Sequence, residues 1–460
     1  MLFRVIVHYF IRKQIGWYFS ADLRRKPAMS DDWMFTWGLT AIAFGGASLI
    51  VPLYVVALGG NAFVLGVLFA TASIIGVPSA LVFGRLADRT GRRRSYVLLA
   101  ITIITVMMAI IPLVNRITLV IIANALLWFA FAAAVPVLTL LSVVGTPEAH
   151  WSTRIARLNK FQGIGWALGL LLGFVVIAIG TRFVDEMSAQ RAFFLICSGC
   201  TLLSLVLAVR TLPADEQSDV IPSPRRVRRR LLTTNRFNIR GAAFPITPFR
   251  VDVRQFSFHS FVARFTPRLA FYYLAVFLFF AGFGMFFAPL PEYLTRVGFD
   301  PSTIFMLYFI LNAGAAVFFG VAATLSVKFD LIHVHTGGLL VRGLAIPLIA
   351  LIGVALAGTT VGYGLAIGVF FIIGLTWAVI VVTAATLVTK LAPAFIRGEA
   401  LGVYSALSAL AGGVGGLLGG WLATVTYSMT FGAAGVLVII GAGVVFTLQS
   451  GRDSNPATIS

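Results

Sequence analysis

The sequence predicts an all-α polytopic membrane protein with twelve transmembrane helices in two pseudo-symmetric six-helix bundles. Of its 460 residues, 59% are hydrophobic and only 11% are charged, and its mean hydropathy is +0.97. Soluble domains carry about 25% charged residues, so a soluble fold is excluded. Apolar runs recur along the chain, and about 20 apolar residues are enough to span a bilayer as a helix.

Twelve apolar runs are long enough to cross a membrane, and short polar segments separate them. We expect helices at residues 33–57, 62–83, 95–114, 117–144, 154–179, 191–210, 269–294, 301–325, 334–357, 360–389, 398–424 and 428–449. They divide the chain into an N-terminal arm (1–32), a first six-helix bundle (33–210), a basic linker (211–268), a second bundle (269–449) and a tail (450–460).

The cations of this chain fix its predicted orientation. Residues 84–94 contain five arginines between two apolar runs, so they must form a short aqueous hairpin, which faces the cytoplasm. If both termini are also cytoplasmic, only four of the 35 Lys and Arg residues fall on the other side: Arg116, Arg182, Arg191 and Arg296. We therefore expect a protein of the inner or plasma membrane with both termini in the cytoplasm.

The net charge of +19 does not indicate a nucleic-acid partner. In a membrane protein, surplus cations mark cytoplasmic segments and attract anionic headgroups. The arm at 1–32 is too short and too charged to span, and we expect it to lie on the inner surface. The bilayer is thus one expected partner, and a small-molecule substrate is the other.

The hairpin also carries a family signature. It reads glycine at 84, Leu-Ala-Asp-Arg at 86–89 and Gly-Arg-Arg-Arg at 91–94. This pattern resembles the loop between the second and third helices of the major facilitator superfamily, whose members are secondary transporters. The resemblance covers essentially the whole membrane portion. It implies two halves that rock around one central substrate site.

The resemblance also implies a conformational latch at the cytoplasmic side. The carboxylate of Asp88 would bind the start of the eleventh helix near residues 397–399 and hold that side closed. Arg92 would pair with Asp88 or with Glu148, and the two glycines would allow tight turns and close approach. The expected latch residues are Gly84, Asp88, Arg89, Gly91, Arg92 and Glu148. Arginines that only set topology would not need the aspartate or the glycines.

A weak internal repeat supports two related halves. At an offset of 239 residues, Pro52, Tyr54, Gly59 and Asn61 fall on Pro291, Tyr293, Gly298 and Asp300. Glycines also recur at intervals of three and four in the fifth and eleventh helices, which allows close helix approach in lipid. Such a stripe fits either ordinary tight packing or a sliding seam between the halves.

Polar and aromatic positions on helix faces suggest where a substrate binds. Residues at helical spacing on the first, fourth, fifth, seventh, eighth, tenth and eleventh helices form the candidate cavity: Thr40, Phe44, Asn124, Trp128, Gln162, Trp166, Phe283, Asn312, Trp377 and Tyr404. An aromatic lining with few polar groups suits an amphipathic ligand. For any one aromatic residue, packing or lipid contact remains the alternative.

Charges within the spans are few. None of the sixteen acidic residues lies clearly in mid-membrane, although a proton-coupled carrier usually has such a carboxylate. Arg342 lies about 12 Å into the predicted ninth helix. It either snorkels inward, which we favour, or pairs within the bundle. As the single cation within the membrane, it argues against a strongly anionic substrate.

Catalytic chemistry has no motif here. We find no nucleophile elbow, phosphate loop or metal-ligand cluster, so we expect neither an enzyme nor a cofactor. The CxxC at Cys197 and Cys200 lies in an apolar run without a second ligand pair, which favours packing over metal binding.

These patterns favour a monomeric exporter of small amphipathic molecules, with proton or sodium coupling left open. The sequence also departs from the drug-antiporter subfamilies. Those place arginine where Asn124 stands, twelve residues before Pro136, and a Gly-Pro pair in the fifth helix that is missing here. Uptake of a neutral nutrient such as a sugar, or a receptor that binds without transport, are the alternatives.

Overall fold

The computed structural model describes residues 32–143, 151–215, 266–356, 358–393 and 396–450. Within these ranges the chain is helical, and twelve helical segments are long and apolar enough to cross a membrane. The first half comprises α2 (Asp32–Ala57), α3 (Ala62–Thr90), α4 (Arg93–Ile110), the short η1 (Ile111–Leu113), α5 (Ile117–Val143), α6 (Trp151–Gly180) and α7 (Glu186–Thr211). The second half comprises α10 (Pro267–Phe287), α11 (Leu290–Arg296), α12 (Pro301–Lys328), α13 (Leu331–Leu356), α14 (Thr360–Leu391), α15 (Arg397–Ala423) and α16 (Tyr427–Ser450).

The predicted helices are confirmed, with corrections at their ends. The predicted hairpin at 84–94 is mostly helical, because α3 continues to Thr90 and α4 begins at Arg93. Arginine, leucine and alanine are strong helix formers, so nothing before Gly91 ends the helix. Gly91 adopts φ 68° and donates its N–H to the Ala87 carbonyl at 3.1 Å. A left-handed glycine is the usual helix stop.

The seventh span is broken near one end. α10 ends at Phe287 and α11 begins at Leu290, so the predicted single helix at 269–294 is two pieces. Pro289 and Pro291 lie at this break, and proline removes a backbone donor and clashes with the preceding turn.

The internal repeat is visible in the turns that follow the first and seventh spans. Gly59 has φ 87° and Gly298 has φ 91°, a conformation that favours glycine. Asn61 caps α3 by accepting from the Val64 N–H at 3.1 Å, and Asp300 caps α12 by accepting from the Thr303 N–H at 3.1 Å. The two halves therefore share their local turn chemistry.

Hydrogen bonds also set the charge state of the Asp300 cap. Burial alone would raise the pKa of its carboxyl group. Hydrogen bonds from Ser302 and Thr303 outweigh that effect and leave the pKa below its ordinary value. The cap is thus charged at neutral pH and suits the positive end of the α12 dipole.

Glycines set the packing within each half. A Cβ on Gly169 of α6 would lie 2.0 Å from the Ile42 carbonyl oxygen of α2. In the second half, a Cβ on Gly415 would lie 1.9 Å from the Ala281 oxygen of α10, and one on Gly419 2.4 Å from the Met285 oxygen. These glycines let paired helices approach to backbone contact.

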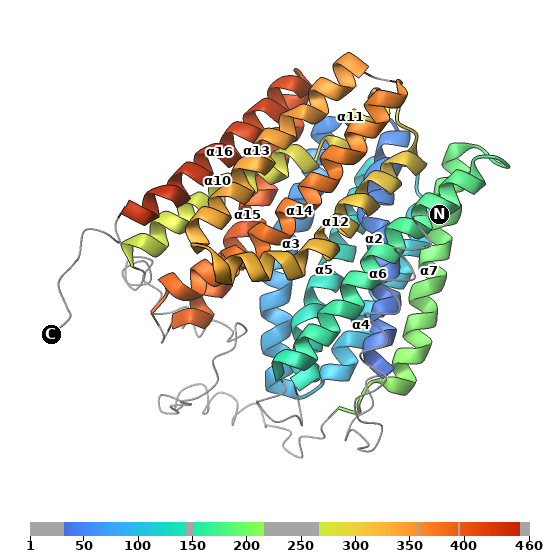
Figure 1. Cartoon of the computed structure of the whole chain (residues 1–460). Coiled ribbons are helices and arrows are strands. Elements are labelled where there is room, and N and C mark those ends of the chain that lie inside the picture. The colour runs from blue at the N-terminus through green and yellow to red at the C-terminus, as the bar shows by residue number, and fades with distance from the viewer. Residues whose placement is uncertain (1–31, 144–150, 216–265, 357, 394–395, 451–460) are drawn as a thin grey trace, which may run out of the picture.

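The halves touch mainly through α3 with α15 and α6 with α12 (Figure 1). We call the end of the bundle that carries residues 58–61 and 297–300 the turn end, and the end that carries residues 84–94 the arginine end. A Cβ on Gly420 would lie 2.5 Å from the Ala62 oxygen, and one on Gly66 2.7 Å from the Gly416 oxygen. These residues are all in the part of α3 and α15 nearest the turn end.

The second contact between the halves, α6 with α12, is likewise closer at the turn end than at the arginine end. A Cβ on Gly173 would lie 2.3 Å from the ring of Phe305, near the turn end. Toward the arginine end most of α12 from residue 316 to 328 is exposed, and a Cβ on Gly320 would meet no atom within 4 Å. Among the described residues, the halves are thus in closest contact at the turn end.

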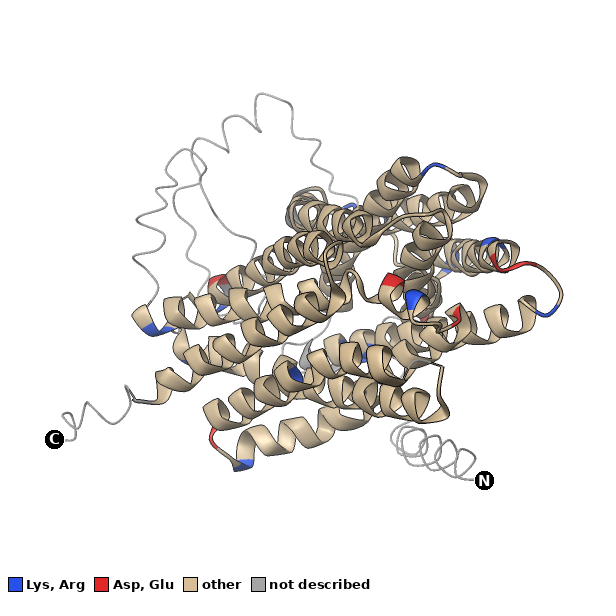
Figure 2. Ribbon diagram, turned by 90° about the horizontal axis from the view of Figure 1, so that it is seen from above, with Lys and Arg blue, Asp and Glu red and all other residues tan. Residues whose placement is uncertain are grey.

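Charged residues lie mostly at helix ends and in the connections, and the helices themselves are largely free of them (Figure 2). At the arginine end, Asp215 follows α7 and binds the start of α4. Its carboxylate accepts from the Arg94 N–H at 2.7 Å and from the Ser95 hydroxyl at 2.6 Å. The first five residues of the predicted linker, 211–215, are therefore attached to the first half.

Candidate substrate site

An aromatic cluster lies in the middle of the first half, where α2, α5 and α6 meet. Phe44 stacks on Phe131 with ring centroids 3.9 Å apart, and its edge meets Trp128 at 5.0 Å. Trp166 lies 5.6 Å from Phe44, and Trp37 stacks on Phe131 at 5.4 Å. Trp128 and Trp166 are half-buried, so the cluster keeps part of its aromatic surface open.

A second cluster lies at the corresponding depth of the second half. Phe283 contacts Phe280 at 5.4 Å and Trp377 at 6.2 Å between centroids. Phe280 in turn contacts Tyr404 at 6.1 Å. Phe280, Trp377 and Tyr404 are half-buried, whereas Phe283 is 4% exposed. α10, α14 and α15 supply this cluster.

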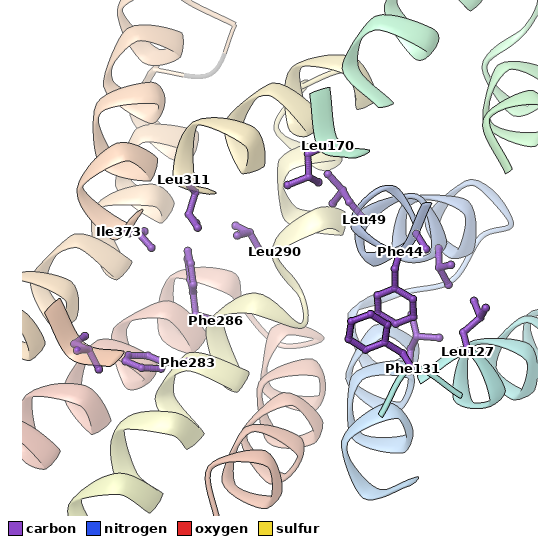
Figure 3. Close-up of a cluster of buried hydrophobic side chains, with 14 of the residues drawn as sticks. Phe44, Leu49, Leu127, Phe131, Leu170, Phe283, Phe286, Leu290, Leu311 and Ile373 are labelled. Carbon is purple, nitrogen blue, oxygen red and sulfur yellow. The ribbon is translucent and has the colours of Figure 1, made fainter. Parts of the chain in front are cut away.

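The two clusters are related by the repeat. Phe44 and Phe283 stand 239 residues apart, the offset that also pairs the turns. Each contacts several rings of its own cluster. Figure 3 shows Phe44 against Phe131 in one group, and Phe283 near Phe286 in the other. Each half thus brings its own aromatic surface to the centre of the bundle.

The position of Arg342 contradicts the favoured prediction that it snorkels. The side chain is 1% exposed and lies about 16 Å along α13, in mid-span. Its Nη1 donates to the Ile373 carbonyl at 2.9 Å and lies 3.5 Å from the Thr376 hydroxyl. Its guanidinium carbon lies 4.3 Å from the centroid of the Phe283 ring. Hydrogen-bond acceptors and aromatic rings of the second half hold the side chain inside the bundle, so it does not extend toward the membrane–water interface.

The polar members of the predicted cavity differ in their surroundings. Gln162 accepts from the Trp37 Nε1 at 2.9 Å and so joins the first cluster. Asn312 donates to the Tyr308 carbonyl of its own helix at 2.8 Å. Asn124 is 5% exposed, on the face of α5 that carries Trp128.

Thr40 does not belong to the aromatic clusters. It is fully buried, and its hydroxyl lies 2.7 Å from that of Ser204 on α7. Helical spacing predicts Thr40 on the face of Phe44. A buried hydroxyl without a hydrogen bond is unfavourable, however, and Ser204 on α7 supplies the partner. It packs inside the first half, and this part of the cavity prediction is wrong.

Part of the signature stretch lies among the described residues. Gly84 lies inside α3 and makes no turn, and a Cβ there would meet Pro136 at 3.5 Å, an ordinary van der Waals distance. Arg92 is exposed at the start of α4. The side chains of Asp88 and Arg89 and the whole of Glu148 lie outside the described residues, so the latch stays a prediction.

Two buried polar groups were not predicted as site residues. His335 is fully buried, with Nδ1 2.6 Å from the Thr383 hydroxyl and Nε2 3.3 Å from the Tyr272 hydroxyl. Glu292 is 4% exposed near the turn end, where it pairs with Arg296 at 2.9 Å and accepts from the Tyr427 hydroxyl. The partners of His335 come from α14 and α10, and Tyr427 comes from α16, so sequence spacing does not reveal these contacts; only the Glu292–Arg296 pair, four residues apart on α11, is local.

The described residues contain no group of three or more His, Cys, Asp or Glu side chains that could hold a metal ion. Cys197 is buried against α2, where a Cβ on Gly46 would lie 3.2 Å from its sulfur. This position fits the expected packing role.

Comparisons with known proteins agree with this architecture. The family profile described as Major Facilitator Superfamily matches residues 33–416. None of the curated proteins matches the chain in sequence. Solved structures with the same fold include the nucleoside transporter NupG (TM-score 0.64, 15% identity, covering 92% of this chain and 98% of that one). A peptide transporter, POT, in complex with sulfate gives 0.69 at 16% identity, covering 91% of this chain and 94% of that one.

A bacterial homologue of the human lysosomal transporter Spinster, in an inward-facing and occupied conformation, gives a TM-score of 0.65 at 16% identity, covering 92% of this chain and 97% of that one. At these identities the structures establish the fold and not the substrate. The profile match spans most of the chain, and the twelve apolar helices are those of a multi-pass membrane protein. The chain belongs to the major facilitator superfamily and is a secondary transporter.

Proposed function

We propose that this transporter exports small amphipathic molecules across the inner or plasma membrane, with the arginine end in the cytoplasm. The pair of aromatic clusters around Phe44 and Phe283 is the observation that carries the proposal. Aromatic surface in mid-membrane with few free polar groups favours a ligand that has a substantial apolar body.

The charge distribution supports the orientation. Five arginines at 84–94 and both termini would share the cytoplasmic side, as the excess of cations on that side requires. In this orientation the contacts at the turn end close the outer side. The described conformation would then be the one that admits substrate from the cytoplasm, which is where an exporter loads.

Uptake of a neutral sugar has less support. A sugar site needs several free donors and acceptors, because each buried hydroxyl left unpaired is unfavourable. The Gln162 carbonyl and the Asn312 amide already have partners in this protein. A receptor that binds without transport is the remaining alternative.

Flux measurements test the proposal. Everted vesicles and proteoliposomes containing the full chain would be given fluorescent amphipathic compounds, with pH and sodium gradients applied separately. We expect accumulation inside everted vesicles, driven by one of the two gradients. Phe44→Ala should reduce flux, whereas Phe271→Ala, which removes a ring that is 57% exposed on α10, should not.

Three results would contradict the proposal in different ways. Uptake in right-side-out vesicles only would reverse the direction. Transport of sugars in preference to amphipathic compounds would change the substrate class. Saturable binding without flux under any gradient would indicate a receptor.

A further inference from the structure

Arg342 is a buried cation whose charge no described residue neutralises. Its side chain is 1% exposed, and the described residues include no Asp or Glu that forms an ion pair with it. The buried Glu292 is already paired with Arg296 and Tyr427 near the turn end. A charge buried in a bundle is strongly unfavourable unless it is compensated, and such residues usually mark a functional site.

The hydrogen bonds of Arg342 are incomplete on one side. A guanidinium has five N–H donors in a planar fork. Both hydrogen bonds to α14, to the Ile373 carbonyl and the Thr376 hydroxyl, leave from Nη1. Nε is buried and has no acceptor. The edge of the fork that includes Nε is therefore free to bind a planar acceptor such as a carboxylate.

Aromatic rings surround the guanidinium. Phe283 lies 4.3 Å, Trp377 5.4 Å and Phe287 5.6 Å from its central carbon. Cation–π contacts make the buried charge tolerable but do not neutralise it. Trp377 also belongs to the half-buried surface of the second cluster, so the cation is in contact with rings proposed to hold the substrate.

We propose that Arg342 binds a carboxylate on the transported molecule, so that the substrate is an amphipathic monoanion. This inference rests on the proposed function and narrows its substrate class. The apolar body would lie on the aromatic clusters, and the carboxylate would reach the free edge of Arg342 as Phe283 and Trp377 move aside. Apart from Arg342, the Lys and Arg residues in α10 to α16 lie at helix ends. The site can therefore neutralise one negative charge on the substrate but not several.

Three probes with one aromatic body test the inference on the purified full chain in nanodiscs. They are 1-naphthaleneacetate, its neutral amide 1-naphthaleneacetamide, and 1-naphthylmethylammonium. Tryptophan quenching measures their affinities. We expect the carboxylate to bind at least about tenfold more tightly than the amide, and the ammonium most weakly, because charge-assisted bidentate bonds are strong.

Variants of Arg342 assign this preference to one side chain. Arg342→Gln should reduce the difference between carboxylate and amide to within about twofold. Arg342→Lys keeps the charge but loses the planar fork, so its preference should be intermediate. Arg182→Gln removes an exposed loop arginine and should leave the preference unchanged. If Arg342→Gln does not fold, the ranking by the native chain and by Arg342→Lys decides the matter.

Several outcomes would overturn the inference. The inference is wrong if the amide binds to the native chain as tightly as the carboxylate does, or if the carboxylate preference survives in Arg342→Gln. A lower Tm in Arg342→Gln with an unchanged preference would make Arg342 a structural brace between α13 and α14. Amphipathic flux without a carboxylate preference refutes this inference but leaves the proposed function standing. Saturable, carboxylate-selective binding without flux would support this inference but refute the proposed function as an exporter.

Discussion

Replacing Gly420 with alanine is expected to force the two halves apart at the turn end. Its Cβ would lie 2.5 Å from the Ala62 oxygen and 2.8 Å from the Gly66 Cα. Both are backbone atoms, so no side chain can rotate to make room. The clash ends only if α15 and α3 separate, which is the movement that opens this end.

The magnitude follows from the cost of an overpacked contact, about 1–3 kcal/mol. The cost falls on the conformation that is closed at the turn end and not on the one that is open there. The ratio of the two should then shift by about 5- to 150-fold toward the open one.

Two other glycines, one beside Gly420 on α15 and one on α12, provide controls. Gly419→Ala meets the Met285 backbone of α10 at 2.4 Å, within the same half, so it should lower Tm without favouring either conformation. Gly320→Ala meets nothing within 4 Å and should leave both properties unchanged or slightly raise Tm.

Pulsed EPR distances and thermal unfolding measure the two effects. Spin labels would replace Arg182 and Thr424, which are exposed near the turn end of opposite halves, in a background with Cys197 and Cys200 changed to alanine. Gly420→Ala should lengthen the distance distribution. An unchanged distribution in Gly420→Ala, or the same lengthening in Gly419→Ala, would refute the idea that this seam is the moving contact.

Three further predictions concern single side chains. Asp88→Asn should preserve membrane insertion but lower flux and increase thiol accessibility at the arginine end; no change in either would refute the latch. Asp300→Ala should cost about 0.5–2 kcal/mol of stability by removing the α12 cap. Because the folded-state pKa of Asp300 is lowered, the stabilisation that its charge provides is present above the unfolded pKa of about 4 and is lost as the pH falls through the folded pKa. The drop in Tm caused by Asp300→Ala should therefore shrink at low pH, whereas the drop caused by Asn61→Ala should not depend on pH. Gln162→Ala leaves the Trp37 Nε1 without its acceptor, so it should lower the free energy of unfolding by about 1 kcal/mol, seen as a lower Tm. Adding Trp37→Phe to the same chain removes the unpaired donor and should recover part of that loss.

Most of the fold could be predicted from sequence, because bilayer thickness sets helix length and arginine position sets topology. Helix ends were harder. Residues 84–90 were expected to be a loop on account of their charge, but charge removes a segment from hydrocarbon without unwinding it. The helix continues until Gly91, where the backbone becomes left-handed. The break before Leu290 was missed although two prolines marked it.

The candidate site was predictable only in part, because nearly every helix face here is apolar. Periodicity identifies residues that share a face, and Phe44 and Phe283 do lie in aromatic clusters, although their role as substrate-binding residues stays a prediction. Periodicity does not say whether that face meets lipid, another helix or the centre, so Thr40 was misplaced. The prediction that Arg342 snorkels is wrong because its partners cannot be recognised from sequence. The Ile373 carbonyl and the Phe283 ring, which hold it inward, lie 31 and 59 residues away in the chain.

The attachment of Asp215 to the start of α4 has a mechanical consequence. Because the carboxylate binds Arg94 and Ser95, the chain is attached to the first half as far as residue 215, beyond the end of α7. Any force or binding event on the segment that joins the halves is therefore delivered to α4, directly beside Gly91. The connection is thus coupled to the arginine end from its first residues and is more than a passive tether.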